Sequence, residues 1–307
     1  MTSPELFDRK MLARQRDRAA ARIVAHDFLL QRATDDIVER LRGIQRDFPV
    51  AVNLGAHHGV MSRALAALPS VGTVISVEES AGLLRQCPDP RVRADMEMLP
   101  FGGERLDLVV SALALQFAND LPGTLVQIRR ALKPDGLFLA ALFGGATLQE
   151  LRAALMTAET EITGGAAPRV APMADVRDFG GLLQRAGFNL PVSDTDIVQV
   201  SYATPFALMD ELRGMGAANV LRERSSRPLR RDVLMRAAEI YAGHYGTEDG
   251  RVTATFEIIT LTGWAPHESQ QKPLRPGSAQ ARLADALGTE ERSGGVKADP
   301  GTIKNSD

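Results

Sequence analysis

The sequence predicts an α/β fold in which a mostly parallel sheet is covered by helices on both faces. From residue 49 onward, short runs rich in Val, Ile and Leu alternate with segments of helical period, which is typical of βαβ units. The runs are continuously apolar, as expected for strands buried on both faces. With 307 residues, 44% apolar and 24% charged, the chain has the length and composition of a globular protein with one large domain or two.

The expected strands fall into an early and a late group. The early group lies at residues 50–54, 73–78, 106–111 and 137–142. The late group lies at 192–202 and 252–262, and the last run is rich in Thr, Ile, Val and Phe. Two helices, starting at Pro205 and after Pro228, are expected between these late strands.

Local signals place the other helices. Apolar residues between Leu121 and Leu132 step by four, three and four, with Asn119 or Asp120 placed as the cap, and a Pro-Asp-Gly turn at 133–136 is expected to end the helix. The segment 147–150 has the form of a capping box. A further helix is expected at 175–186, with Gly187 in the left-handed position that closes a helix.

We expect a helical region at 1–48, a main domain at 49–270 with a helical insertion at 203–250, and a mostly flexible tail at 271–307. The tail is rich in Lys, Pro, Gly, Ser and Ala. In the first region, the Arg-rich run at 9–22 is interpreted as a solvated or partner-facing helix, because acids at Glu5, Asp8 and Asp17 are atypical of a transit peptide.

Composition excludes several classes of protein. A net charge of -2 argues against binding to nucleic acid by bulk electrostatics, and no stretch has the roughly 18 apolar residues of a spanning helix. The single Cys87 excludes an internal disulfide framework and a thiolate metal site within one chain. A cytoplasmic location is therefore expected, without nucleic acid partners and without a transmembrane segment.

A glycine turn follows the first strand and is the first candidate ligand site. Gly55 and Gly59 stand in the segment 53–59 between a strand and a helix, where α/β folds place ligands. Glycines there let the backbone approach a ligand, and Asn53 and Ala56 belong to the same turn. A plain strand-to-helix turn is the alternative interpretation.

Two acids extend this candidate site. Glu78 ends the second strand, 78 − 55 = 23 positions after Gly55, near the roughly 20-residue spacing at which an acid meets ribose hydroxyls. Asp95 precedes an apolar loop in which its carboxylate would accept from an adenine amino group while Met96 and Leu99 cover the ring. The alternative is that both are exposed acids beside Glu79 and Glu97.

The order of these features resembles class I S-adenosylmethionine-dependent methyltransferases. Outside that core, the chain is similar to the family of mitochondrial respiratory complex I assembly factor 5 and its bacterial relatives, over roughly 7–279. The segments that carry this resemblance are 119–122, 143–145, 158–161, 185–189, 194–196, 214–216, 263–264 and 267–270. More distantly, the core is similar to the malonyl-carrier-protein methyltransferase of biotin synthesis.

The resemblance implies a seven-stranded, Rossmann-like sheet with a reversed last strand. It implies S-adenosyl-L-methionine as cofactor, and a protein or carrier-protein substrate linked to complex I assembly, such as an iron–sulfur subunit, at the periphery of the respiratory membrane. The expected cofactor-binding residues are Asn53, Gly55, Ala56, Gly59, Glu78, Asp95, Met96 and Ser111. Arginine hydroxylation of that subunit is one alternative, and a non-catalytic assembly module with a degenerate cofactor site is another.

The glycine turn departs from the usual pattern of this class. Asn53 stands where an acid is usual, and His57 stands where the middle glycine belongs. An imidazole restricts positive φ and fills volume that the methionine part of the cofactor would use, while Asn53 lacks the charge that pairs with its ammonium. We therefore expect altered cofactor binding.

No metal site is expected, because the adjacent side chains of His57 and His58 diverge on a turn and no further ligand spacing accompanies them. No catalytic residue is assigned, since methyl transfer needs little acid–base chemistry beyond an aligned nucleophile. The candidate residues on the substrate side are Gln116, Phe117, Asn119, Gly144, Tyr202 and Met215. Core packing is the alternative for the aromatic residues.

Overall fold

We describe a computed structural model of the chain, covering residues 5–225, 227–271, 285 and 288–289. The chain divides into two units, Met1–Glu268 and Ser269–Asp307. The description below concerns the first unit. The tail expected at 271–307 lies almost wholly outside the described residues.

The first unit contains a single seven-stranded sheet in the order β3-β2-β1-β4-β5-β7-β6. The strands are β1 Phe48–Leu54, β2 Val71–Val77, β3 Arg91–Val92, β4 Leu106–Ala112, β5 Leu132–Phe143, β6 Asn189–Tyr202 and β7 Val252–Trp264. The first five run parallel, while β7 is antiparallel to both β5 and β6. The predicted fold class, a doubly wound sheet with a reversed last strand, is confirmed.

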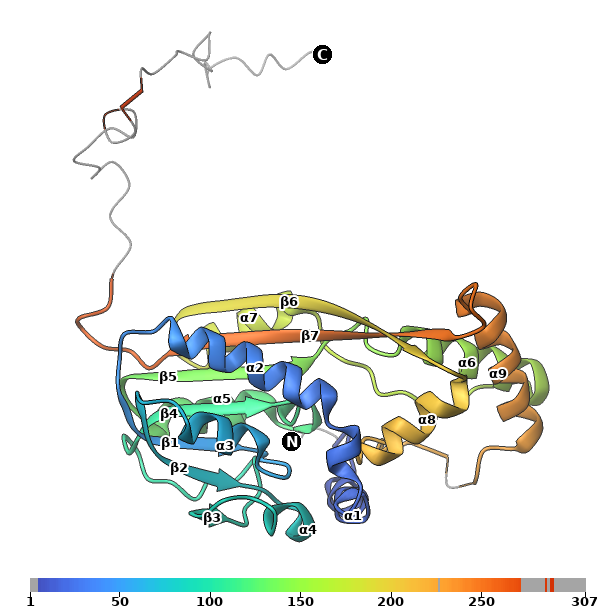
Figure 1. Ribbon diagram of the computed structural model, residues 1–307, viewed down its shortest axis with the longest axis horizontal. Helices are drawn as coiled ribbons and strands as arrows, with labels where there is room; N and C mark the ends of the chain where they lie inside the picture. The colour runs from blue at the N-terminus through green and yellow to red at the C-terminus, as the bar shows by residue number, and fades with distance from the viewer. Residues whose placement is uncertain (1–4, 226, 272–284, 286–287, 290–307) are drawn as a thin grey trace, which may run out of the picture. The chain divides into compact units, whose positions relative to one another are not determined.

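Helices cover both faces of this sheet (Figure 1). The helices are α1 Arg9–Ala19, α2 Phe28–Arg42, α3 Val60–Ala66, α4 Ala81–Leu84, α5 Leu121–Ala131, α6 Gln149–Thr163, α7 Val176–Arg185, α8 Pro205–Gly214 and α9 Arg231–Tyr245. Short 3₁₀ turns stand at Ile23–His26 (η1) and Leu115–Phe117 (η2). One core cluster includes residues of α2, α3, α6, α8 and α9, and the other includes residues of α5 and α7, so the two faces have separate cores.

Local sequence signals explain several helix ends. The Asp120 carboxylate accepts from Gly123 N at 2.9 Å and starts α5, as expected from sequence. Asp175 caps α7 in the same way, and Gly187, with φ of 84°, follows its end. Helices α8 and α9 lie between β6 and β7 in the chain, which confirms the predicted helical insertion.

Two local predictions were wrong. Residues 133–136 do not separate α5 from a strand, because β5 begins at Leu132 and these residues form a bulge within it. The capping box at 147–150 is absent: Thr147 Oγ1 donates to Glu257 O at 3.2 Å, and the Glu150 carboxylate accepts from Thr255. Both side chains instead bind the edge of β7, so α6 begins without a side-chain cap.

Candidate functional site

The glycine turn between β1 and α3 lies at the carboxyl end of the sheet, between β2 and β4. Gly55 has φ of 70°, and a Cβ there would collide with Cβ of Ala114. The amides of Gly55 and Ala56 both donate to Val77 O at 2.9 Å. Glycine is therefore required by packing within the protein, and these two amides are held by β2 rather than presented to a ligand.

The Glu78 carboxylate lies directly after β2 and is fully buried. Its Oε2 accepts from His57 N at 3.0 Å and its Oε1 accepts from Ser80 N at 3.0 Å. A third partner is Arg16, whose Nη1 lies 3.5 Å from Oε1. Glu78 is thus an ordered carboxylate that ties the glycine turn to the segment before α4.

The His57 side chain is buried beside the last residue of β4. Its Nε2 lies 3.1 Å from Ala112 O, and its backbone has φ of 49°, a strained conformation for a residue with a Cβ. Burial, followed by the nearby charge of Arg16, lowers the pKa of His57 to about 3. The ring is therefore neutral at physiological pH and adds no positive charge to the site.

Two further predicted cofactor residues, Asn53 and Ser111, are the last but one in β1 and β4, and each has a buried side-chain atom without a hydrogen-bond partner in the described structure. In Asn53 the amide nitrogen donates to Ser62 Oγ at 2.9 Å, while Oδ1 has no partner. In Ser111 the hydroxyl oxygen also has no partner. Unpaired buried polar atoms are rare in folded proteins, and each one calls for an explanation such as a catalytic role or a bound water or ion.

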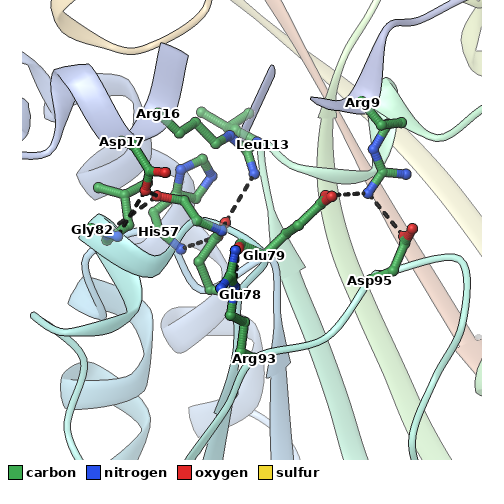
Figure 2. A network of polar contacts seen from close by, with 12 residues as sticks. Arg9, Arg16, Asp17, His57, Glu78, Glu79, Gly82, Arg93, Asp95 and Leu113 are labelled. Carbon is green, nitrogen blue, oxygen red and sulfur yellow. Dashed lines mark hydrogen bonds and ion pairs between the residues drawn. The ribbon is translucent and has the colours of Figure 1, made fainter. Parts of the chain in front are cut away.

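Helix α1 lies across this site (Figure 2). Arg16 reaches the Glu78 carboxylate, and the Asp17 carboxylate accepts from Ser80 Oγ at 2.6 Å and from Gly82 N at 2.8 Å. Arg16 is only 3% exposed. The interpretation of the Arg-rich run as a solvated helix is therefore wrong for this face of α1.

A second arginine of α1 holds the other predicted acid. Arg9 Nη2 lies 2.9 Å from both Glu79 and Asp95, and Nη1 lies 3.3 Å from Glu97 (Figure 2). These charges raise the pKa of Arg9 against the opposing effect of its burial. The sequence carries a signal for both arginines, because their spacing places them on one helix face with the apolar Leu12 and Ala19. The structure buries Leu12, Arg16 and Ala19.

The hydrogen-bond acceptors of the site fit the adenosine part of S-adenosylmethionine, but the space beside them is filled. Glu78 and Asp95 carry acceptors for hydroxyl and amino groups, and Met96 is buried next to them. The space between Arg16, Gly55, Glu78 and Met96 is closed by these side chains and leaves a free volume of about 0 Å³. In this conformation, therefore, the space beside Glu78 has no room for a nucleoside.

A cavity of about 40 Å³ lies next to this filled space. Its polar lining comes from Arg16, His26, Asp27, His57 and Gln116. A mostly apolar cavity of about 100 Å³ lies beyond it. Its lining shares Phe117, Phe143, Met215 and Ala217 with the first.

The structure brings only some of the predicted substrate-side residues together. Gln116, Phe117 and Met215 line the cavities, but Asn119, Gly144 and Tyr202 do not. Asn119 holds the backbone of Phe7, and a Cβ at Gly144 would meet the Glu257 carboxyl group at 2.6 Å. Tyr202 belongs to the core that α9 joins, where burial raises the pKa of its phenol.

The two adjacent histidines of the glycine turn are engaged separately. His58 Nε2 lies 3.0 Å from Asp27 Oδ2, in a buried pair on the side of the turn that faces α2, while His57 contacts β4. Among the described residues, no group of three or more His, Cys, Asp or Glu side chains is arranged to hold a metal ion. Within the same residues, no helix is long and apolar enough to cross a membrane.

Comparisons with known proteins match this architecture. A family model described as a methyltransferase domain matches residues 52–140. The mitochondrial arginine-hydroxylase NDUFAF5 of Mus musculus is 40% identical over 95% of this chain and 89% of its own length. The human protein of that name is 41% identical, over 92% of this chain and 85% of its own. The chain belongs to the NDUFAF5 family.

The resemblance of this NDUFAF5-family chain to methyltransferases extends further. The malonyl-[acyl-carrier protein] O-methyltransferase of Methylovorus sp. is 32% identical over 85% of this chain and 90% of its own length. A solved structure from Bacillus halodurans, described as a candidate methyltransferase, has a TM-score of 0.53 at 15% identity and covers 76% of this chain and 98% of its own. These comparisons confirm the resemblance and the class I methyltransferase fold.

Proposed function

We propose that the protein is an S-adenosylmethionine-dependent methyltransferase that acts on a protein or carrier-bound substrate during assembly of respiratory complex I. The observation that carries the proposal is the buried, ordered carboxylate of Glu78 at the carboxyl end of β2. Strand β2 lies next to β1, and the strand order reverses between β1 and β4, which is where open α/β sheets bind ligands. When bound, S-adenosylmethionine supplies an activated methyl group. The protein residues bind and orient the cofactor and the acceptor group, and they exclude water.

Each part of the site has a role in this proposal. Glu78 accepts from the ribose hydroxyls, Asp95 accepts from the adenine amino group, and Met96 covers the ring. The glycine turn with Asn53, Gly55, Ala56 and Gly59, together with Ser111, forms the remaining wall. The acceptor group reaches the site through the apolar cavity walled by Phe117, Phe143 and Met215.

Calorimetric titration with S-adenosylmethionine and S-adenosylhomocysteine tests the cofactor assignment. We expect binding by the native protein, a loss of at least tenfold in affinity for Glu78→Gln, and no change for Glu248→Gln, an exposed acid on a distant turn. His57→Gly should bind more tightly, since it removes a ring and relieves a positive φ. If no variant binds either nucleoside, the methyltransferase proposal fails, which leaves arginine hydroxylation or a non-catalytic assembly module.

Arginine hydroxylation is the second candidate, because relatives that are about 40% identical over most of this chain carry that name. Mass spectrometry of complex I iron–sulfur subunit peptides, from strains with and without the protein, separates the two chemistries. Loss of a methyl group in the deletion strain supports the first candidate. Loss of an oxygen atom from an arginine supports the second.

A further inference from the structure

A groove lies between α1 and the end of α8, which stand side by side (Figure 1). Its volume is about 360 Å³, and its charged lining consists of Arg18 on α1, Arg22 just after it and Arg213 on α8. Part of its floor is Gly214, where a Cβ would collide with the ring of His26. The floor is therefore packed directly against η1.

The groove is positively charged, because the acids near it are already paired. Arg22 lies 2.9 Å from the Asp210 carboxylate. The Glu211 carboxylate is engaged by the histidine of η1 at 2.8 Å. The side chains of Arg18 and Arg213 make no hydrogen bond or ion pair with any described residue. Two positive charges in the groove thus lack a direct partner in the described part of the chain.

The same charge continues along the outer face of α1. Lys10 and Arg14 precede Arg18 at intervals of four residues, so the three side chains form one row along the helix, about 6 Å apart. All three are exposed. Asp17, the acid of this helix, is turned toward α4, where it accepts from Ser80 Oγ. The row and the groove together form a basic surface on a chain whose net charge is -2.

The groove adjoins both cavities on the acceptor side. Gly216 lines the groove and the 40 Å³ cavity, and Ala218 lines the groove and the 100 Å³ cavity. At roughly 10–15 Å³ for each water-sized group, 360 Å³ has room for at least about 24 such groups, which suits a peptide segment better than one small anion. A segment seated there lies against the wall of the acceptor site.

We propose that this basic surface docks an acidic segment of the protein that carries the acceptor group. Carboxylates of that segment pair with Arg18 and Arg213, and acids further along it meet the row on α1. Charge complementarity of this kind steers a partner and fixes its register. The concave shape favours a protein over the flat surface of a membrane. The identity of the partner rests on the proposed function, whereas the docking itself requires no cofactor.

Disulfide exchange at a cysteine placed in the groove measures this recruitment. Ala218→Cys is reacted at low salt with two activated-disulfide peptides that differ only in carrying glutamates or glutamines. The native Cys87 is buried and reacts slowly. We expect the acidic peptide to react about fivefold faster or more, since one exposed charge pair contributes up to about fivefold, and the preference to vanish at high salt. Gly243→Cys, in open space on α9, corrects for the intrinsic reactivity of the peptides.

Arg18→Gln combined with Arg213→Gln should abolish the preference for the acidic peptide. Both arginines are exposed, so this variant should fold as the native protein does. The matched control combines Arg177→Gln with Arg185→Gln, two exposed arginines of α7, and should keep the preference.

Equal rates for the two peptides, or a preference that survives loss of Arg18 and Arg213, would overturn the proposal. An equally large preference for a small disulfide reagent with a single carboxylate would assign the groove to a small anion instead. Flotation with vesicles of phosphatidylcholine and phosphatidylglycerol that depends on both arginines, without a peptide preference, would assign the surface to a membrane. The nucleoside titration is a separate measurement, so the docking and the cofactor assignment can fail independently.

Discussion

The buried neutral imidazole of His57 makes the stability of the protein depend on pH. Its pKa is about 3 in the folded protein and 6.5 in the unfolded chain. Below pH 6.5 the unfolded chain takes up a proton that the folded protein refuses, so the free energy of unfolding falls as the pH drops from 6.5 toward 3. At 1.36 kcal/mol per pH unit, the loss at pH 5 is about 2 kcal/mol.

Urea unfolding of the native protein and of His57→Gln at pH 7.5 and pH 5 measures this loss. Carboxylates titrate in both proteins and cancel in the comparison, so the drop in unfolding free energy should be about 2 kcal/mol smaller for His57→Gln. His244→Gln, an exposed histidine on α9, should keep the native pH dependence. An identical drop for the native protein and His57→Gln would refute the assignment of a buried, neutral His57.

Three further predictions concern packing. Burial raises the pKa of Cys87 to about 11, so a thiol reagent should label the native protein slowly at pH 8 and rapidly in urea. Gly59→Ala should lower the unfolding free energy in a urea titration by about 2 kcal/mol, because φ is 83° and the new Cβ would lie 2.9 Å from the Cys87 backbone. In the same titration, the control Gly243→Ala should raise the unfolding free energy by up to ~1 kcal/mol, because Gly243 lies in open space on α9. Tyr241→Phe should cost about 1 kcal/mol in thermal unfolding, through the lost hydrogen bond to Thr253 O.

The sequence was most informative where function depends on neighbours along the chain. Gly55 and Glu78 were identified by their spacing within one strand–helix–strand unit, and the structure brings Glu78 into contact with the backbone of His57 in that turn. The sheet was predictable for the same reason. A continuous apolar run predicts each of the early strands.

Errors arose where a side chain has a distant partner. Thr147 and Glu150 have the spacing of a helix cap, but they bind β7 residues more than 100 positions away, and no local pattern reveals that edge. Arg9 and Arg16 belong to the run that was interpreted as a solvated or partner-facing helix, and arginine side chains are mostly exposed in folded proteins. Only the fold shows that carboxylates 62 to 88 positions later in the chain meet them.

The last two strands continue past the rest of the sheet as a ribbon of two. Pairing of β5 with β7 ends at Ile258, whereas β6 and β7 remain paired for six more residues on each strand, from Glu257 back to Val252. This ribbon carries α8 and α9 at its far end (Figure 1). Because the far end of this ribbon is not hydrogen-bonded to the parallel strands, a change in its length leaves their pairing intact, and the helical insertion can vary without altering the strand ends that position Glu78 and the glycine turn.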